Sequence, residues 1–371
     1  MRIGVPKEIK VHEYRVGLTP GSVRELCAHG HTVLVETGAG AGIGASDADY
    51  RQAGAELAAS AAEVFARAEM VVKVKEPQAS ERALLRPGQV LFTYLHLAPD
   101  PEQAQDLIAS GVVAIAYETV TSAAGGLPLL APMSEVAGRL AVQAGAHCLE
   151  KSAGGMGVLL GGVAGVAPAR IAILGAGVVG TNAAQMAVGT GAQVVVLDRN
   201  LDALRRLDTL FGGRVMTVHS NADDLEREVL AADLVISGVL IPGAAAPKLI
   251  TRAMMAGMKK GSVIVDVAID QGGATEGARA TTHAEPTYVL DGVVNYMVAN
   301  MPGAVPRTST YALNHATLPF VLALADKGWQ RALREDPHLA AGLNVAAGAI
   351  AYAAVADSLG LPYTPAARLI R

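Results

Sequence analysis

Short runs of hydrophobic residues alternate with amphipathic segments along most of the chain. The runs that predict β-strands in the first third are residues 2–5, 31–37, 70–75, 90–96 and 112–118. The segments with helical spacing of apolar positions lie near residues 20–29, 46–53, 60–68 and 101–109. Because strands and helices alternate, we predict an α/β fold with a doubly wound parallel sheet covered on both faces.

A second α/β series follows the first. Its predicted strands are residues 170–174, 193–198, 214–220, 233–240, 262–270 and 293–300. A long helix that Ser134 can cap precedes this series, and after Pro302 the pattern is wholly helical. Since the late helices have no sheet of their own, we expect them to return to the first domain. The prediction is a discontinuous domain of residues 1–130 and 307–371, joined by two long helices to a domain of residues 131–306.

The composition fits two domains with much buried apolar surface. Of the 371 residues, 51% are hydrophobic and only 17% are charged, so much apolar surface must be buried, either inside two compact domains or between subunits. We expect a homo-oligomer. The net charge of −4, without a Lys/Arg-rich stripe, argues against nucleic acid or a membrane surface as a partner. The N-terminus lacks the layout of a signal peptide, and Cys27 and Cys148 fit small buried hydrophobes. We therefore expect a cytoplasmic protein.

The segment RIAILGAGVVG has the layout of a dinucleotide-binding turn, with Gly175, Gly177 and Gly180 between an apolar strand and a helical segment. The first glycine permits a sharp turn, the second lets the backbone approach a pyrophosphate, and the third lets helix and strand pack closely. Asp198 follows by about 20 positions, where a carboxylate can accept hydrogen bonds from ribose hydroxyls. This acid repels a 2′-phosphate and favours NAD over NADP, although Arg199 beside it could pair with such a phosphate.

Ligands of an open α/β sheet bind at the carboxyl ends of its strands, so the predicted strands also indicate where the chemistry lies. The residues at such ends in the first series are Arg15, Lys75, His96 and Glu118. Those of the second series, beside the glycine turn, are Asp198, Leu240, Asp270 and Asn300. We expect these two groups to face each other across a hinge.

Four of these residues suggest chemistry. Lys75 ends a strand predicted to be buried, where an ammonium group needs a nearby anion. A small carboxylate substrate could be that anion, and Arg15 could bind the same carboxylate. The alternative is that both residues are ordinary surface charges. His96 can carry a proton near neutrality, although a lone histidine beside a core strand is often structural. Asp270 could be catalytic or could merely form a turn. The other histidines lack metal-ligand spacing, so we expect no metal site.

Together these segments resemble the family of bacterial L-alanine dehydrogenases. The motifs that carry the resemblance are MRIGVPKEIK with YRVGLTP, VKVKEP, FTYLHLA, LLAPMSEVAGRLA, ILGAGVVG, VDVAIDQGG and VANMPGAVPRTSTYAL. They span essentially the full length, and several are specific to this family. The resemblance implies two Rossmann-like domains, usually assembled as a hexamer, and a reaction in which L-alanine, NAD and water give pyruvate, NADH and ammonium.

By the same resemblance, the ligands of the substrate carboxylate fall on Arg15 and Lys75, and the catalytic pair falls on His96 and Asp270. His96 would accept a proton from the alanine ammonium group or from the attacking water. Asp270 would orient water or stabilise a cationic intermediate.

A small substrate side chain implies a small pocket, with Tyr94 and Met133 as candidate walls and Asn300 beside the substrate. The expected NAD contacts are Ser134, Gly175, Gly177, Val178, Val179, Gly180, Asp198, Ser220, Val239, Leu240, Val267, Ala268, Ile269, Asp270, Arg279, Val298, Asn300 and Met301. Some members carry a basic side chain shortly after the ribose-binding acid, where this sequence has Ala203. The adenine-side contact therefore stays open.

Two other functions fit part of this pattern. The nucleotide-binding component of a proton-pumping transhydrogenase shares the architecture but does not need the set Arg15, Lys75 and His96. An enzyme that condenses pyruvate reductively with a larger amine would need an open pocket beside His96.

Overall fold

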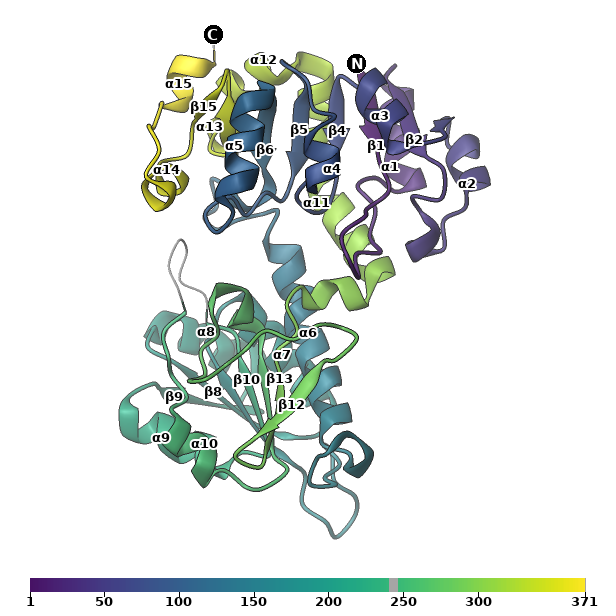
Figure 1. Ribbon diagram of the computed structural model, residues 1–371. Helices are drawn as coiled ribbons and strands as arrows, with labels where there is room; N and C mark the ends of the chain where they lie inside the picture. The colour runs from purple at the N-terminus through teal and green to yellow at the C-terminus, as the bar shows by residue number, and fades with distance from the viewer. Residues whose placement is uncertain (240–245, 371) are drawn as a thin grey trace. The chain divides into compact units, whose positions relative to one another are not determined.

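The computed structural model describes residues 1–239 and 246–370, which form two compact units (Figure 1). Unit 1 comprises Met1–Met133 and Val305–Arg371, and unit 2 comprises Ser134–Ala304. Each unit has a mostly parallel sheet and a hydrophobic core of its own. The predicted fold class, two α/β domains of which the first is discontinuous, is confirmed.

The sheet of unit 1 has the strand order β15-β14-β6-β5-β4-β1-β2-β3. These strands are β1 (Arg2–Val5), β2 (Thr32–Glu36), β3 (Glu56–Ala58), β4 (Met70–Val72), β5 (Val90–Thr93), β6 (Val113–Ala116), β14 (Leu343–Ala346) and β15 (Ala349–Ile350). Neighbouring strands are parallel except at β6–β14 and β14–β15. The central strands β4, β5 and β6 are buried throughout, as a sheet covered on both faces requires.

Helices cover both faces of this sheet (Figure 1). The helices of unit 1 are α1 (Pro20–Ala28), η1 (Ala41–Ile43), α2 (Asp47–Gln52), α3 (Ala61–Arg67), α4 (Ala79–Arg82), α5 (Pro101–Ser110), η2 (Tyr117–Thr119), α11 (Pro306–Lys327), α12 (Trp329–Glu335), α13 (Pro337–Ala340), α14 (Ala353–Leu359) and α15 (Ala366–Leu369). Local signals explain their ends. Asp100 caps α5, Pro101 occupies its first turn, and Gly111 ends it in the left-handed conformation.

The prediction that the chain is wholly helical after Pro302 is wrong. Strands β14 and β15 form a hairpin that extends the sheet of unit 1 beyond β6. Its turn is Ala347-Gly348, with φ angles of 49° and 73°, as a two-residue hairpin turn requires. Alanine is uncommon at such a position, and short alanine-rich strands have little β-propensity, so the pattern does not reveal this hairpin.

The sheet of unit 2 has the strand order β12-β13-β11-β10-β7-β8-β9. The strands are β7 (Arg170–Leu174), β8 (Gln193–Asp198), β9 (Val215–His219), β10 (Leu234–Ser237), β11 (Val263–Asp266), β12 (Thr287–Leu290) and β13 (Val293–Tyr296). The helices are α6 (Ala131–Cys148), η3 (Lys151–Ala153), α7 (Val178–Gly189), α8 (Leu201–Phe211), α9 (Ala222–Ala231), α10 (Arg252–Gly257), η4 (Val267–Gln271) and η5 (Met301–Ala304). Among these strands, β12 is antiparallel to its neighbour.

Two local predictions in unit 2 need correction. Helix α6 begins at Ala131, so Ser134 lies inside its first turns and does not cap it. Strand β11 ends at Asp266, and Asp270 lies in the short helix η4 that follows. None of the helices in the described part of the chain is long and apolar enough to cross a membrane.

Candidate active site

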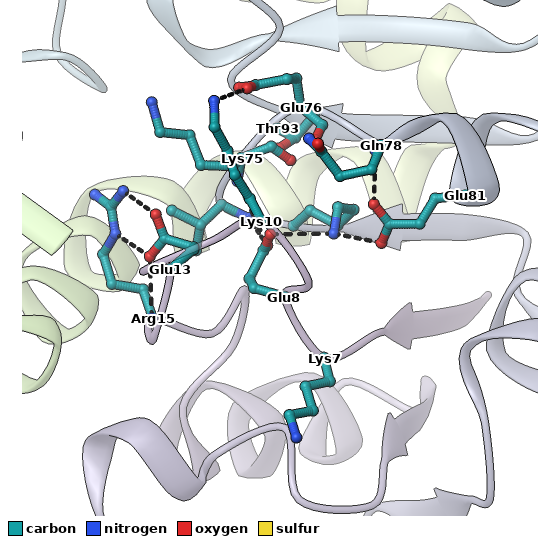
Figure 2. Close-up of polar contacts among 12 residues, drawn as sticks. Lys7, Glu8, Lys10, Glu13, Arg15, Lys75, Glu76, Gln78, Glu81 and Thr93 are labelled. Carbon is teal, nitrogen blue, oxygen red and sulfur yellow. Dashed lines mark hydrogen bonds and ion pairs between the residues drawn. The ribbon is translucent and has the colours of Figure 1, made fainter. Parts of the chain in front are cut away.

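Charged side chains gather in unit 1 where β1 and β4 end (Figure 2). Arg15, in the loop after β1, is 2% exposed. Its Nε and Nη2 donate to the two carboxylate oxygens of Glu13 at 2.7 and 2.6 Å. Burial alone would lower the pKa of Arg15, but the bonds to Glu13 and its charge raise that pKa above the ordinary value. The guanidinium is thus a fixed cation, with Nη1 lying 3.0 Å from Sδ of Met133.

The segment after β4 carries two lysines with different environments. Lys73 is fully buried, and its Nζ donates to Glu8 at 3.1 Å and to Glu81 at 2.7 Å. The burial argument made for Lys75 therefore applies to Lys73, whereas Lys75 is half-buried. Glu8 also accepts the backbone N–H of Val74 at 2.7 Å and that of Lys75 at 3.4 Å. This carboxylate fixes the backbone from which the Lys75 side chain projects.

His96 follows β5, with a side chain that is 44% exposed. Its φ of 49° is left-handed, and Glu118 accepts its backbone N–H at 2.6 Å. Nδ1 of the imidazole lies 3.5 Å from Oε2 of Glu76, a buried oxygen without another hydrogen-bond partner in the described part of the chain. Burial would raise the pKa of Glu76, but the imidazole and two lysine ammonium groups hold it well below its usual range. An ionised carboxylate therefore faces one nitrogen of His96.

Two buried side chains, Tyr94 and Met133, complete this cluster. The hydroxyl of Tyr94 donates to the carbonyl of Leu129 at 2.5 Å, and its ring centroid lies 5.8 Å from that of His96. Met133 contacts the guanidinium of Arg15. The predicted substrate-side residues that unit 1 brings together are Arg15, Lys75, Tyr94, His96 and Met133.

The positions of strand ends in the sequence do not assign Glu8, Glu13 or Glu76 to the site. All three lie in the segments KEIKVHEYR and KVKEP that carry Arg15 and Lys75. The signal was therefore an unusual density of opposite charges near strand ends, but which charges pair depends on the fold.

In unit 2 the glycine turn lies between β7 and α7. Gly175 has a φ of 101°, which only glycine adopts readily. A Cβ on Gly180 would lie 1.7 Å from the carbonyl oxygen of Gly175, whereas a Cβ on Gly177 would meet nothing within 4 Å. No side chain caps α7, so the N–H groups of Val178 and Val179 lie at a helix start suited to an anion. The three glycines therefore have the different roles that the fingerprint assigns to them.

Asp198 ends β8 beside this turn. Its Oδ2 accepts the N–H of Ala176 at 2.6 Å, and Ser220, after β9, donates its N–H to the Asp198 carbonyl at 3.0 Å. Val239 also lies near the turn, because its Cγ2 would be 3.4 Å from a Cβ on Gly175. Leu240 lies outside the described residues.

Asp270 is exposed in η4. The buried carboxylate of Asp266 supports this segment by accepting the N–H groups of Ala268 at 3.0 Å and Ala274 at 2.7 Å. Ala268 and Ile269 are themselves buried, and half-buried Val267 precedes them. Only Asp270 in this segment exposes an ionisable side chain.

The remaining predicted residues of unit 2 are spread over three segments. The exposed Arg279 has its guanidinium 4.3 Å from the ring centroid of Tyr288. Val298 forms an isolated parallel β-bridge with Thr281, and Met301 is buried. Asn300 has a φ of 61°, and its carbonyl lies 3.2 Å from Nε2 of His283. In the described residues, no group of three or more His, Cys, Asp or Glu could hold a metal ion.

Comparison with known proteins covers both units. The models for the N-terminal and C-terminal domains of alanine dehydrogenase/PNT match residues 4–137 and 141–353. The alanine dehydrogenase of Halomonas elongata is 62% identical over 370 residues, which is 100% of both chains. This chain belongs to the alanine dehydrogenase/PNT family. The family resemblance inferred from the motifs is confirmed.

Other relatives agree. The alanine dehydrogenase of Bacillus subtilis is 57% identical and covers 100% of this chain and 98% of its own. A solved L-alanine dehydrogenase has a TM-score of 0.94 and 54% identity, covering 97% of this chain and 99% of that one. A transhydrogenase from Sinorhizobium meliloti has a TM-score of 0.82 at 27% identity, covering 95% and 100%. The three relatives above that exceed 50% identity are each named as alanine dehydrogenases.

Proposed function

We propose that this family member catalyses the reversible NAD-dependent oxidative deamination of L-alanine to pyruvate and ammonium. Alanine dehydrogenases that are 57% and 62% identical along essentially the whole chain support this reaction. The observation that carries it to particular residues is the cluster of Arg15, Lys75 and His96 in unit 1. Nucleotide binding alone does not require a guanidinium, an ammonium and an imidazole together.

NAD fits the glycine turn of unit 2. The open space at Gly177 and the uncapped start of α7 suit a pyrophosphate, and Asp198 can accept hydrogen bonds from ribose hydroxyls. When bound, NAD supplies the hydride acceptor for alanine oxidation, and NADH supplies the donor for the reverse reaction. The other family contacts, including Ser134, belong to this proposal.

Arg15 and Lys75 are proposed to bind the substrate carboxylate. Nε and Nη2 of Arg15 bond to Glu13, which holds this cation in place, and a guanidinium is the side-chain group that pairs most specifically with a carboxylate. Holding the carboxylate at two points fixes the direction of the Cα–H bond, and this fixed orientation lowers the barrier to hydride transfer.

His96 is proposed to accept the proton released when water adds to the oxidised substrate, and to return it in the reverse reaction. Because Nδ1 faces Glu76, Nε2 is the nitrogen proposed to exchange the proton. Asp270, on unit 2, is proposed to orient water or to stabilise positive charge on the substrate.

We further propose that the protein is a homo-oligomer, a hexamer as in the family, and works in the cytoplasm. The high apolar fraction supports an oligomer, and the unpaired state of Cys27 and Cys148 fits a reducing compartment. Sedimentation analysis of the purified protein tests the assembly.

Initial rates with alanine, glycine, serine and 2-aminobutyrate, each with NAD and NADP, test the reaction. We expect alanine with NAD to be preferred, and 2-aminobutyrate to be slower by about 10- to 200-fold because of its extra methylene.

His96→Ala should lower kcat by roughly 10²- to 10⁴-fold while NADH still binds. Retention of a tenth of kcat would refute the proton-transfer role, and hydride transfer to a second dinucleotide without pyruvate turnover would favour the transhydrogenase alternative.

A further inference from the structure

The turn that carries His96 is held by side chains from two other elements. Glu118 lies in η2, after β6, and its Oε1 accepts the N–H groups of His96 at 2.6 Å and Leu95 at 3.1 Å. Its Oε2 lies 3.3 Å from the same Leu95 nitrogen. From α5, the buried Gln103 donates to the Leu95 carbonyl at 2.6 Å. The N–H groups of Leu95 and His96 and the carbonyl of Leu95 are therefore fixed.

These bonds hold the backbone from which the imidazole projects. The φ of 49° at His96 is left-handed, a conformation that residues other than glycine seldom adopt. Strained backbone of this kind persists only where the surroundings hold it in place. Here one carboxylate holds two consecutive N–H groups, and a relaxed backbone would aim the side chain elsewhere.

We propose that Glu118 is a positioning residue for His96, whose left-handed backbone it fixes so that the imidazole reaches the substrate. This rests on the catalytic role of His96 proposed above. Glu118 acts through the backbone and transfers no proton. The capacity of Glu118 to accept hydrogen bonds therefore matters more than its charge. Glu76 differs, because its carboxylate faces the imidazole ring of His96 itself.

Substitution of Glu118 tests this directly. Glu118→Ala should lower kcat on the order of 10²-fold, because a small misplacement of a reacting group has an effect of that size. The KM for pyruvate and the Kd for NADH should change by less than about threefold, since their ligands are untouched. Glu118→Gln keeps an acceptor oxygen and should recover kcat to within about tenfold of the parent.

Two comparisons make the outcome specific. Glu102→Ala removes the same charge from a side chain that is 77% exposed, and should leave kcat unchanged. Should Glu118→Ala fail to fold, Glu118→Asp, which is too short to serve both N–H groups, should show the same split between kcat and KM. A Glu118→Gln variant as impaired as Glu118→Ala would overturn the proposal, because charge would then be the decisive property.

The His96→Ala background separates this proposal from the proposed function. If Glu118 acts only through His96, adding Glu118→Ala to His96→Ala should cause no further loss. A further loss would overturn the positioning role. If His96→Ala remains active, the catalytic role of His96 fails and the positioning proposal fails with it. If His96→Ala is inactive but Glu118→Ala turns over normally, only the positioning proposal fails.

Discussion

Glu76 serves two neighbours with one carboxylate. One oxygen pairs with Lys10, and the other faces Nδ1 of His96 at 3.5 Å (Figure 2 shows the contact with Lys10). The side chain is only 12% exposed, so burial opposes its ionisation, yet the surrounding positive groups hold its pKa below the usual range. The ionised form is therefore stabilised by folding.

Glu76→Gln should lower the free energy of unfolding by about 1–3 kcal/mol near pH 7. The substitution removes the buried carboxylate charge and leaves the ammonium group of Lys10 without its ion pair. A group with a lowered pKa contributes stability that is present above its unfolded pKa and is lost as the pH falls through the folded pKa. The deficit should therefore be constant above the ordinary glutamate value of 4.5 and shrink below it. Urea denaturation across this pH range measures it.

Glu56→Gln is the matched control, because Glu56 forms an ion pair with Arg67 in which the side chains are 50% and 35% exposed. Such a pair contributes about 0–1 kcal/mol. Equal losses in the two variants, or a Glu76→Gln deficit that does not change below pH 4.5, would show that Glu76 is not stabilised in its ionised form.

At the scale of single residues, the sequence locates the candidate ligand positions but not the residues that support them. Arg15, Lys75 and His96 stand out because strand ends collect ligands. Their partners cannot be chosen from the pattern. Glu118 is 22 positions from His96, and the contact between them exists only because β5 and β6 are neighbours.

At the scale of elements, each glycine of the turn between β7 and α7 is required for a different reason. Gly180 faces backbone that a side chain would overlap, whereas Gly177 faces open space. The same substitution at these two positions should therefore affect different properties. One property is the packing of helix on strand, and the other is the approach of a phosphate.

Gly180→Ala should lower the free energy of unfolding by roughly 3 kcal/mol, because the new methyl must displace backbone. Gly177→Ala should leave stability within about 1 kcal/mol of the parent. It should still raise the Kd for NADH by roughly tenfold or more, because the methyl occupies the space of the pyrophosphate. Thermal denaturation and NADH fluorescence titration measure the two effects.

Gly189→Ala provides the control within the same helix, because a Cβ there also meets nothing and lies at the far end of α7. It should bind NADH as the parent does and be slightly more stable. Normal NADH affinity in Gly177→Ala would place the pyrophosphate away from this turn.

The elements themselves were predictable where apolar runs were long and parallel pairing buried both faces. β1, β2, β4 and β7 are examples, and caps such as Asp100 mark the helix that follows. Edge elements were missed. Strand β12 is half-exposed, and β14 with β15 is short and rich in alanine, so neither has the pattern of a buried strand.

At the scale of the whole molecule, each unit has a core made from its own residues. In unit 1 the C-terminal hairpin contributes Val345 and Ile350 to a cluster that includes Leu91 and Ala114. A cluster in unit 2 has members between residues 172 and 297. Since these clusters share no residue, we expect a core substitution to weaken mainly the unit that contains it.

Val345→Ala should lower the free energy of unfolding of unit 1 by about 2 kcal/mol, because two buried methyl groups are lost from a fully buried position. In a urea titration, the midpoint for alanine turnover should fall while the midpoint for NADH binding stays where it is in the parent. Turnover and NADH fluorescence measured on the same samples provide both curves.

Val235→Ala is the counterpart in β10 of unit 2, equally buried. It should lower the midpoint for NADH binding, and added NADH should oppose this by about 2.7 kcal/mol at 100 times its Kd. The same NADH should not restore Val345→Ala, because a ligand stabilises only the structure that binds it. If Val345→Ala instead loses turnover and NADH binding at the same urea concentration, the two units unfold as one cooperative structure. The C-terminal hairpin would then stabilise the nucleotide site of unit 2 as well as the sheet of unit 1.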